Sequence, residues 1–479
     1  MTRKSLRRLE IGGLALLVGV VGLTGVDRGA HAQGRGAAGA PTYRVVPLWP
    51  LPFRDDSWVL GSITGVTVDA QNHVWVAHRA DSLQTNEKGM VLAQPSSSVC
   101  CTPAPPILEF DAAGKLISSW GGPSQGYQWP QVPGGIAVDA KGNVWITAAG
   151  IEPPPPAAGR GRGAAAAAAA EAAEVGIAPG GAGRGAAGAG AQAGRGAAPG
   201  GAAPAGAQAA RGAAPGGAAP AGAGRGAAPA APAAPPVPAD AHVLKFSAAG
   251  RYIMTIGTPG KMDGADSQTT LNRPAAVAYD AAANEVFVAD SGNHRVAVFD
   301  ADSGAYKRHW FAYGEKTAGA PAGPYDPSAP AARSFRDVTC IEIAKDGMVY
   351  VCDRTSNRIQ VFDKSGRFQK EMVIAKDTRG ATVALTAGAT AVISAHGSVW
   401  DVALSNDAQQ RYLFVADGVN MKVRILQRDT LAEVGSFGSG GRYPGQFLAV
   451  DSVATDAAGN VYTGETHHGK RVQKFVANR

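Results

Sequence analysis

The most regular feature of this chain is a short pattern in which apolar and polar residues alternate, break off at Asp, Asn and Gly, and then resume. Residues Gly65–Ala77 and Gly135–Thr147 show it most clearly, each with a turn between two apolar runs. Period-two alternation around such turns is typical of two antiparallel strands joined as a hairpin. Further copies begin near Ala275, Thr339, Trp400 and Asp451, so the pattern predicts six similar hairpin units.

Each unit continues into two more strands. Arg295–Asp300 and Arg358–Asp363 are third strands, and Lys115–Gly121 is a fourth. Four strands in each of six units predict an all-β protein, a six-bladed β-propeller with four-stranded antiparallel blades. The last unit has no fourth strand after Val472–Phe475, so we expect Tyr43–Trp49 to supply it and to close the ring. The alternative, an open solenoid of stacked repeats, needs capping units that are not evident.

Residues 151–239 interrupt this pattern with a sequence of Ala, Gly, Pro and Arg that has almost no aromatic or branched side chains. Such a segment buries too little apolar surface to offset its ordering entropy. We expect a disordered low-complexity insertion that leaves blade two between its second and third strands. The propeller would then comprise residues 43–150 and 240–479. The insertion is either tolerated without a role or serves as an adhesive arm or lid.

The N-terminus has the features of an export signal. Four basic residues within positions 3–8 precede the apolar run Ile11–Val26, and Ala30–Ala32 offers small residues for cleavage. The run contains five glycines and is short for a membrane span, which needs about 20 residues, although an uncleaved anchor is the alternative. We expect residues 1–32 to be a signal peptide and 33–42 a flexible linker. No later segment is long and apolar enough to cross a bilayer, so the mature protein is expected to be periplasmic or extracellular.

The net charge of +7 does not describe the folded part of the chain. Residues 1–32 carry five basic and two acidic side chains, and residues 151–239 carry six Arg and three Glu. Most of the excess therefore lies outside the predicted blades. A nucleic-acid binder would instead carry a basic stripe on its folded surface. Nucleic acid is accordingly excluded as a partner.

The cysteines are interpreted in the oxidising environment that export implies. Cys340 and Cys352 lie symmetrically about Asp346, within a predicted hairpin whose turn is Lys345–Gly347. Opposite positions on paired strands bring Cβ atoms near disulfide distance, so we expect a Cys340–Cys352 disulfide. Adjacent Cys100 and Cys101 form either a strained vicinal disulfide or bonds to two separate partners. No Cys-based metal site has the required spacing.

These units resemble NHL repeats, a propeller family that includes the lyase domain of peptidylglycine amidating enzymes. Val76–Asp81 and Val351–Phe362 are similar to that lyase's pattern, and the resemblance implies that Arg79 and Arg354 lie at the substrate-binding mouth. Guanidinium groups suit that position because they bind a carboxylate bidentately and stay charged.

The lyase's zinc site is not matched. In the family, three histidines begin the innermost strands of three blades, eight residues before a turn glycine. In this chain the six positions of that axial column are Thr64, Gly134, Ala275, Thr339, Trp400 and Asp451. Only Asp451 is a metal-ligand type, and a tetrahedral zinc site needs three or four converging ligands. The family's catalytic tyrosine is also missing, because Ser291–His294 occupies its loop. The resemblance therefore implies the fold and an anion-binding mouth, and it argues against the lyase chemistry.

The ends of the second strands should lie at the same mouth as the starts of the first strands, because adjacent strands are antiparallel. The residues at these ends, which are the candidate ligand-binding groups, are His78, Arg79, Asp290, Asp353, Arg354 and Asp417, followed by Glu465. The alternative is structural: the arginines pair with neighbouring Asp residues between blades, and the Asp residues cap loops. A zinc or calcium site would draw on Asp451, His467 and Glu465, with His78 or His468.

Two functions are consistent with these residues. The first is an exported, monomeric NHL propeller that binds a small anionic ligand, a peptide or a protein at its mouth and catalyses nothing. The second is a metal-dependent lyase or hydrolase with a rearranged site built from Asp451, His78 or His467. A lactonase-type propeller with bound calcium would need an Asn, Asp and Glu set along the axis, where the predicted column supplies only Asp451. Fold alone does not choose among these functions.

Overall fold

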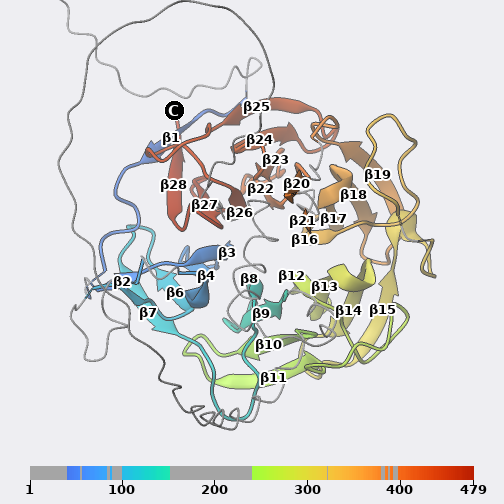
Figure 1. Cartoon of the computed structure of the whole chain (residues 1–479), viewed down its shortest axis with the longest axis horizontal. Coiled ribbons are helices and arrows are strands. Elements are labelled where there is room, and N and C mark those ends of the chain that lie inside the picture. Colours follow the sequence, from blue (N-terminus) through green and yellow to red (C-terminus); the bar gives the residue numbers. More distant parts are fainter. Residues whose placement is uncertain are drawn as a thin grey trace, which may run out of the picture.

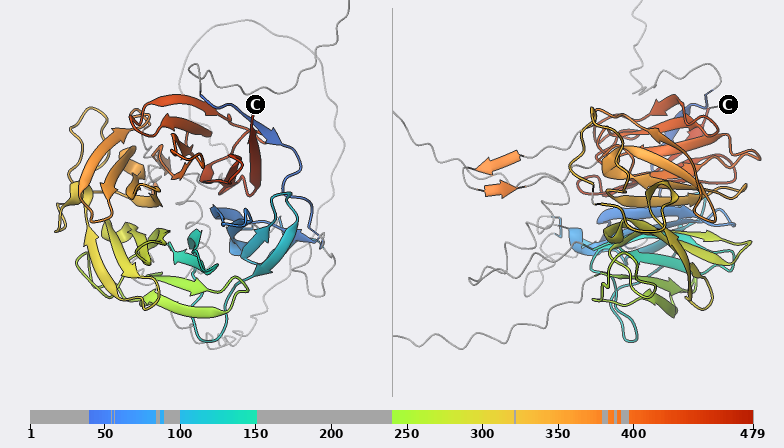
Figure 2. Two further views of the ribbon diagram at one scale, coloured as in Figure 1. Left: turned by 180° about the vertical axis from the view of Figure 1, so that it is seen from behind. Right: turned by 90° about the vertical axis from the view of Figure 1, so that its right-hand side faces the viewer.

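The computed structural model describes residues 40–478 except 54, 56, 84–86, 89–99, 151–239, 321, 379–382, 387–388 and 392–396. Its six four-stranded antiparallel sheets are arranged around a central axis like the blades of a propeller (Figure 1). Seen edge-on, the blades form a disc (Figure 2). This confirms the predicted all-β, six-bladed architecture. The expected signal peptide of residues 1–32 lies outside the described residues.

The strands of the blades follow the chain from the axis outwards. Blades one, two and three contain, in that order, β3 (Ser62–Val68), β4 (Val74–Arg79), β6 (Ile107–Phe110) and β7 (Leu116–Trp120); β8 (Pro133–Val138), β9 (Val144–Ala148), β10 (His242–Phe246) and β11 (Tyr252–Gly257); and β12 (Pro274–Asp280), β13 (Glu285–Asp290), β14 (Arg295–Asp300) and β15 (Tyr306–Trp310).

Blades four, five and six contain, in the same order, β16 (Val338–Ile343), β17 (Met348–Asp353), β18 (Arg358–Asp363) and β19 (Phe368–Val373); β22 (Asp401–Leu404), β23 (Tyr412–Asp417), β24 (Lys422–Gln427) and β25 (Glu433–Phe437); and β26 (Val450–Thr455), β27 (Val461–Glu465), β28 (Val472–Ala477) and β1 (Tyr43–Val46). The smaller elements are the strand pairs β2 (Trp58–Val59) with β5 (Thr102–Pro103) and β20 (Val383–Thr386) with β21 (Ala389–Ala391), and the 3-10 turns η1 (Ala80–Ser82), η3 (Ser291–Asn293), η4 (Ala312–Gly314) and η5 (Arg354–Ser356).

The ring is closed by the N-terminal strand, as predicted. In blade six, β1 pairs antiparallel with β28, and Tyr43 lies opposite Ala477. Both ends of the described chain are therefore held in the same sheet. The side chain of Tyr43 packs against Phe414 and Phe437 of blade five, with ring centroids 5.6 and 5.1 Å apart. The first strand thus forms the outer edge of blade six and covers β28, which would otherwise be the edge strand.

Blade two is assembled from two distant parts of the chain. Val243 of β10 lies opposite Thr147 of β9, although residues 151–239 separate the two strands in sequence. The predicted place of the insertion, between the second and third strands of blade two, is confirmed. The expected disorder of residues 151–239 falls outside the described residues. No helix of the described part of the chain is long and apolar enough to span a membrane.

The core lies between neighbouring blades. Between blades three and four, for example, Phe287 and Trp310 form one cluster with Phe335, Val349 and Phe362, all almost fully buried. Alternation along each strand sends one set of side chains to each neighbouring blade, which is why the apolar pattern has period two.

Both disulfides join residues that are close in sequence. Cys340 lies directly opposite Cys352 in the β16–β17 pairing, and the two form the predicted disulfide with Cα atoms 5.0 Å apart. The hairpin turns at Gly347, whose φ of 83° suits glycine. Cys100 and Cys101 form a vicinal disulfide, which selects the first of the two pairings left open by the sequence.

Candidate functional site

The six first strands surround an axial channel that contains a cavity of about 530 Å³. Here the mouth means the end of this channel at which the first strands begin and the second strands end. Every position of the predicted axial column lines the cavity: Thr64, Gly134, Ala275, Thr339, Trp400 and Asp451. The register deduced from the repeats therefore identified the channel wall correctly.

A network at the mouth joins blades three and four by hydrogen bonds and reaches blade five by a ring contact. Arg354 donates to Asp337 Oδ2 from Nε at 3.0 Å and approaches the same oxygen with Nη2 at 2.8 Å. Ser291 of blade three donates to the other carboxylate oxygen at 2.8 Å. The Arg354 guanidinium also lies 5.2 Å from the centre of the Trp400 ring in blade five. Burial opposes ionisation of Asp337, but Arg354 and Ser291 outweigh it and lower the pKa of this carboxyl.

A second guanidinium, that of Arg273, lines the cavity beside this network. Arg273 immediately precedes β12, with a φ of 49°, and its N–H donates to Asp240 O at 3.2 Å. Its side-chain Nε is buried and has no hydrogen-bond partner among the described residues. Its charge contributes to the lowered pKa of Asp337, which places the guanidinium in that carboxylate's field. A buried donor without an acceptor costs about 1–3 kcal/mol, so this position favours an incoming acceptor.

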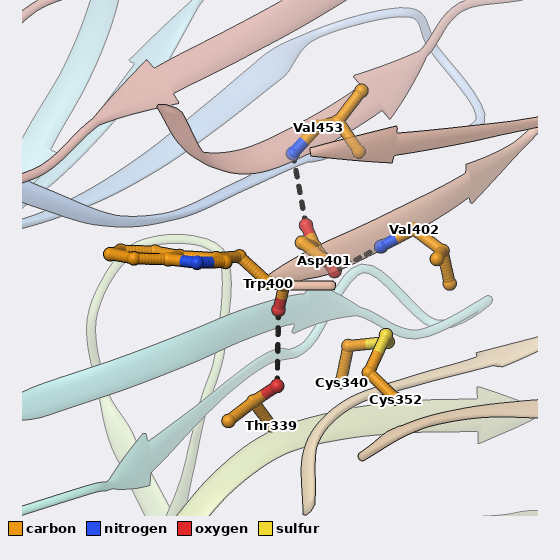
Figure 3. The surroundings of a disulfide bond; sticks show 7 residues. All are labelled: Thr339, Cys340, Cys352, Trp400, Asp401, Val402 and Val453. Carbon is orange, nitrogen blue, oxygen red and sulfur yellow. Dashed lines mark hydrogen bonds between the residues drawn. A yellow bond between two sulfur atoms is a disulfide. The ribbon is translucent and has the colours of Figure 1, made fainter. Parts of the chain in front are cut away.

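Two carboxyl groups of the channel wall resist ionisation. Asp401 accepts hydrogen bonds from the N–H groups of Val402 at 2.8 Å and Val453 at 2.9 Å (Figure 3). Burial nevertheless raises the pKa of Asp401 to about 7. Burial and the neighbouring Asp401 raise the pKa of Glu342 to about 8. Near neutral pH the channel therefore carries less negative charge than its sequence suggests.

Asp451 and His467, both proposed as metal ligands, line the same cavity on blade six. His467 is buried, and its ring meets the Trp400 ring edge-to-face with centroids 6.1 Å apart. The adjacent His468 is exposed. The two histidines therefore face different surroundings, within a turn after β27 in which His467 has a φ of 53°. Their role as metal ligands stays a prediction.

The carboxylates at the ends of the second strands lie outside the cavity lining and are fully buried: Asp290, Asp353, Asp417 and Glu465. Each pairs with the arginine that begins or nearly begins the third strand of its own blade. The pairs are Asp290–Arg295 at 2.8 Å, Asp353–Arg358 at 2.9 Å, Asp417–Arg424 at 2.7 Å, and Glu465–Arg471.

These four residues also accept main-chain N–H groups, and we call them the cap carboxylates. Asp353, for example, accepts from Arg336 and Asp337 at 2.9 Å each, and Asp290 accepts from Asn272 at 2.7 Å. Burial raises the pKa of Asp290, Asp417 and Glu465 against the effect of their arginines. Ligand binding by Asp290, Asp353 and Asp417 stays a prediction. Their complete burial and pairing favour the structural alternative.

His78 occupies the corresponding place in blade one. Its Nδ1 accepts the Gly61 N–H at 3.1 Å and its Nε2 donates to Pro105 O at 2.9 Å, so both ring nitrogens are engaged by the main chain. Burial lowers the pKa of His78 to about 4, which keeps the ring neutral. Arg79, at the end of β4, pairs with Asp81 at 3.4 Å and lies outside the cavity lining. The structure thus places Arg354 in the channel wall but not Arg79.

Four residues of the channel were not predicted from the sequence: Arg273, Asp337, Glu342 and Asp401. Arg273 and Asp337 each directly precede a first strand, which marks them as mouth residues once the repeat register is known. Glu342 and Asp401 stand within first strands whose other inward positions are apolar or small. A single acidic residue in such a strand is a sequence signal for a polar group in the channel wall. What no local pattern indicates is that Arg273 and Asp337 approach each other from two blades.

The weak metal candidates do not form a cluster with enough ligands. Within the described ranges, one group of three His, Cys, Asp or Glu residues has ligand atoms within 4.8 Å of one another, and it consists of Asp69, His73 and Glu109. Asp69 and His73 lie at the turn between the first two strands of blade one, at the opposite end from the mouth, and Glu109 lies beside them on β6. Zinc or calcium in the channel stays a prediction.

Comparison with known proteins supports the repeat and the fold. Residues 271–299, which lie in and just before blade three, match the family model described as "NHL repeat". Together with the six blades, this confirms the NHL-type propeller inferred from the sequence. No curated protein matches this sequence.

Three solved structures are similar over much of the propeller. A streptogramin B lyase is 10% identical, with a TM-score of 0.40 and coverage of 92% of this chain and 98% of its own. A catalytically inactive virginiamycin B lyase from Staphylococcus aureus, solved with quinupristin, is 11% identical with a TM-score of 0.37, covering 91% and 88%. Hydrazine synthase from Kuenenia stuttgartiensis is 14% identical with a TM-score of 0.28, covering 46% and 53%. At these scores the similarities carry no argument about function.

Proposed function

We propose that this protein is an exported binding module that holds a small anionic ligand, or the carboxylate of a peptide, at the mouth of its axial channel without transforming it. The observation that carries this proposal is the buried Nε of Arg273, which has no hydrogen-bond partner among the described residues. An anion placed there supplies the missing acceptor. The same guanidinium lines a cavity of about 530 Å³, which is large enough for such a ligand.

Arg354 provides the second positive group. Its Nε and Nη2 hold Asp337, which leaves Nη1 without a hydrogen bond in the part of the chain that the structure describes. Asp337 fixes the plane of the guanidinium, and Trp400 covers one face of it. An oriented guanidinium loses little entropy on binding a carboxylate or phosphate. The mouth would therefore recognise an anionic group through Arg273 and Arg354 together.

The wall below the mouth favours the same ligand class. The pKa values of about 8 for Glu342 and about 7 for Asp401 reduce the negative charge that would repel an anion near neutral pH. As the pH rises through these values, both carboxyls ionise and repulsion increases. Anion affinity should therefore be higher at about pH 6 than at about pH 9.

The proposal is tested with a short peptide that has a free C-terminal carboxylate, its C-terminally amidated counterpart, and inorganic phosphate, each titrated by calorimetry. Arg273→Gln should weaken binding of the acid or of phosphate about 10- to 100-fold, because it removes a charged hydrogen-bond donor. Arg251→Gln is the matched control, since Arg251 is exposed in blade two and lies outside the cavity lining. Equal binding of the acid and amide peptides, together with no binding of phosphate, would contradict anion recognition.

A metal-dependent lyase is the second candidate, because Asp451 and His467 line the same cavity as Arg354. Elemental analysis of untagged protein and turnover of a peptide ending in α-hydroxyglycine distinguish the two functions. Turnover that disappears in both Asp451→Asn and His467→Gln would replace the binding module with the lyase. Export is tested separately by N-terminal sequencing of the mature chain, which should begin near residue 33.

A further inference from the structure

A second cluster of chemically capable side chains lies far from the channel mouth, at the β3–β4 turn of blade one. Asp69 follows β3, His73 closes the turn, and Glu109 projects from β6. His73 Nδ1 lies 2.8 Å from Glu109 Oε1 and 3.7 Å from Asp69 Oδ2. Exposure of the Asp69 and Glu109 side chains is 7% and 12%, whereas His73 is 33% exposed. The cluster therefore has two nearly buried carboxylates and one imidazole that reaches the surface.

The same turn recurs in blades two and six, where it has a structural function. Asp139 accepts the N–H groups of Lys141 and Asn143 and the indole N–H of Trp145. Asp456 repeats this with the N–H groups of Ala458 and Asn460 and the Tyr462 hydroxyl. In both blades the residue corresponding to His73 is an asparagine whose amide donates to the turn aspartate.

Blade one differs at the position that holds a cation in the other two blades. Strand pairing aligns Glu109 opposite Trp75, Lys245 opposite Trp145, and Lys474 opposite Tyr462. Lys245 Nζ lies 3.7 Å from Asp139 Oδ2 and 4.7 Å from the centre of the Trp145 ring. Lys474 Nζ lies 5.3 Å from the centre of the Tyr462 ring.

The replacement changes the charge balance of the turn. Blades two and six place an ammonium group beside the turn aspartate and its aromatic partner. Blade one places a carboxylate there and adds an imidazole, so the cation is lost and two further metal-ligand groups are gained. A cation bound among the three side chains would restore the charge balance that lysine provides in the neighbouring blades.

We propose that Asp69, His73 and Glu109 form a binding site for a divalent metal ion of the zinc class, located on blade one at the end of the propeller opposite the mouth. One imidazole nitrogen and two carboxylate oxygens suit zinc, and the exposed edge of His73 leaves a fourth position for water. Tetrahedral zinc separates its ligand atoms by roughly 3.4 Å, which lies between the 2.8 and 3.7 Å measured from His73 Nδ1.

Two local features support this ligand set. Asp69 Oδ2 accepts the Trp75 indole N–H at 2.9 Å, which fixes the carboxylate while leaving a lone pair for a metal. Asp69 Oδ1 accepts the N–H groups of Gln71 and His73 at 2.9 and 2.8 Å, so the turn positions its own ligand. Metal binding would replace the hydrogen bond between His73 Nδ1 and Glu109 Oε1.

The test is titration of untagged, chelator-treated protein with Zn²⁺ by calorimetry and with Co²⁺ by visible absorption. We expect one ion per chain. His73→Asn and Glu109→Lys install the residues found in blade two, so the turn should keep its fold. Each should weaken binding by about 100-fold or more, because each removes a direct ligand. Zn²⁺ should raise the melting temperature of the unaltered protein but of neither variant.

His294→Asn is the matched control, because His294 is an exposed loop residue with a φ of 54° that asparagine tolerates. It should bind Zn²⁺ like the unaltered protein. Absence of stoichiometric uptake overturns the proposal. Uptake that is unchanged in both blade-one variants also overturns it and directs attention to His467 and His468. If Glu109→Lys fails to fold, as judged by circular dichroism, His73→Asn decides between these outcomes.

Discussion

At the mouth, a buried side chain accepts main-chain N–H groups both in blades three to six and in blade one. This side chain is charged in blades three to six and neutral in blade one. In the former, a buried carboxylate caps main-chain N–H groups and is neutralised by an arginine, as in Asp353 with Arg358 at 2.9 Å. In blade one, neutral His78 accepts the Gly61 N–H and donates to Pro105 O without any ionic partner. Blade two uses Asp240, which accepts the N–H groups of Gln131 and Val132 at 3.0 and 2.8 Å.

The difference shows that each blade needs an acceptor for main-chain N–H groups at the mouth. These N–H groups belong to the loop that enters the first strand, except in blade five, where Asp417 accepts the N–H of Asn420. A side-chain charge is not required. Buried N–H groups must be hydrogen-bonded, and a carboxylate, an imidazole or an aspartate from beyond the insertion meets that need. In blades three to six the buried carboxylate is paired with an arginine, because an unpaired buried charge is costly. The acidic column that resembles a ligand-binding set in the sequence is therefore chiefly a set of cap residues.

The largest effect should come from breaking one buried pair. Arg358→Met leaves Asp353 buried without its guanidinium, which should cost about 3–5 kcal/mol in the free energy of unfolding measured by urea titration. The control is Arg367→Met in the same blade, where the Arg367 side chain is 78% exposed in its pair with Asp363. That change should cost no more than about 1 kcal/mol. Equal losses of unfolding free energy in the two variants would contradict a larger contribution from the buried Asp353–Arg358 pair.

The uncharged cap of blade one should impose a distinct pH dependence. With a folded pKa of about 4 and an unfolded value of 6.5, His78 is stabilised in its neutral form. The unfolded chain therefore binds the extra proton between these values, and stability falls as the pH is lowered through this window. The loss should approach about 3 kcal/mol.

This dependence is isolated by comparing the unaltered protein with His78→Asn, in which the amide oxygen can still accept the Gly61 N–H. The free energies of unfolding are measured at about pH 7 and about pH 4.5. The difference in unfolding free energy between the two proteins should become smaller as the pH is lowered, because the variant lacks the titrating group. A difference that does not change with pH would mean that His78 titrates normally in the folded state.

The smallest effect is expected in blade two. The N–H groups of Gln131 and Val132 bond to different oxygens of Asp240, so Asp240→Asn keeps an acceptor for only one of them. Among the described residues no arginine pairs with Asp240, so the change leaves no buried guanidinium without a partner. Burial already raises the pKa of Asp240, so removing its charge relieves a penalty. The cost should be about 1–3 kcal/mol by urea titration, because one buried N–H group loses its acceptor. Asp353→Asn should cost more, since it leaves Arg358 buried without its carboxylate. A larger loss of unfolding free energy in Asp240→Asn than in Asp353→Asn would contradict this prediction.

Much of the architecture could be predicted because it depends on local periodicity. The hairpin pattern identified six blades, the closing strand at Tyr43 and the place of the insertion, and the symmetric spacing of Cys340 and Cys352 identified their disulfide. The axial column was also placed correctly, because it is a fixed offset within each repeat. Capping of loops by the aspartates was one of the two alternatives that the sequence left open, but their pairing with the arginines of the same blade was not predicted. Their arginine partners stand five to seven residues later, across a turn whose path is not encoded by alternation.

The sequence by itself therefore determined the number of blades, the strand register and the residues that face the axis, since these follow from period-two burial within a repeat. Tertiary structure decided which polar residues are available for chemistry. Arg273 lies near Asp337 and Arg354 only because neighbouring blades bring the ends of their loops together. Asp353 is not available to a ligand because it is buried and paired with Arg358. Those outcomes depend on burial and charge pairing between segments, which no local pattern specifies.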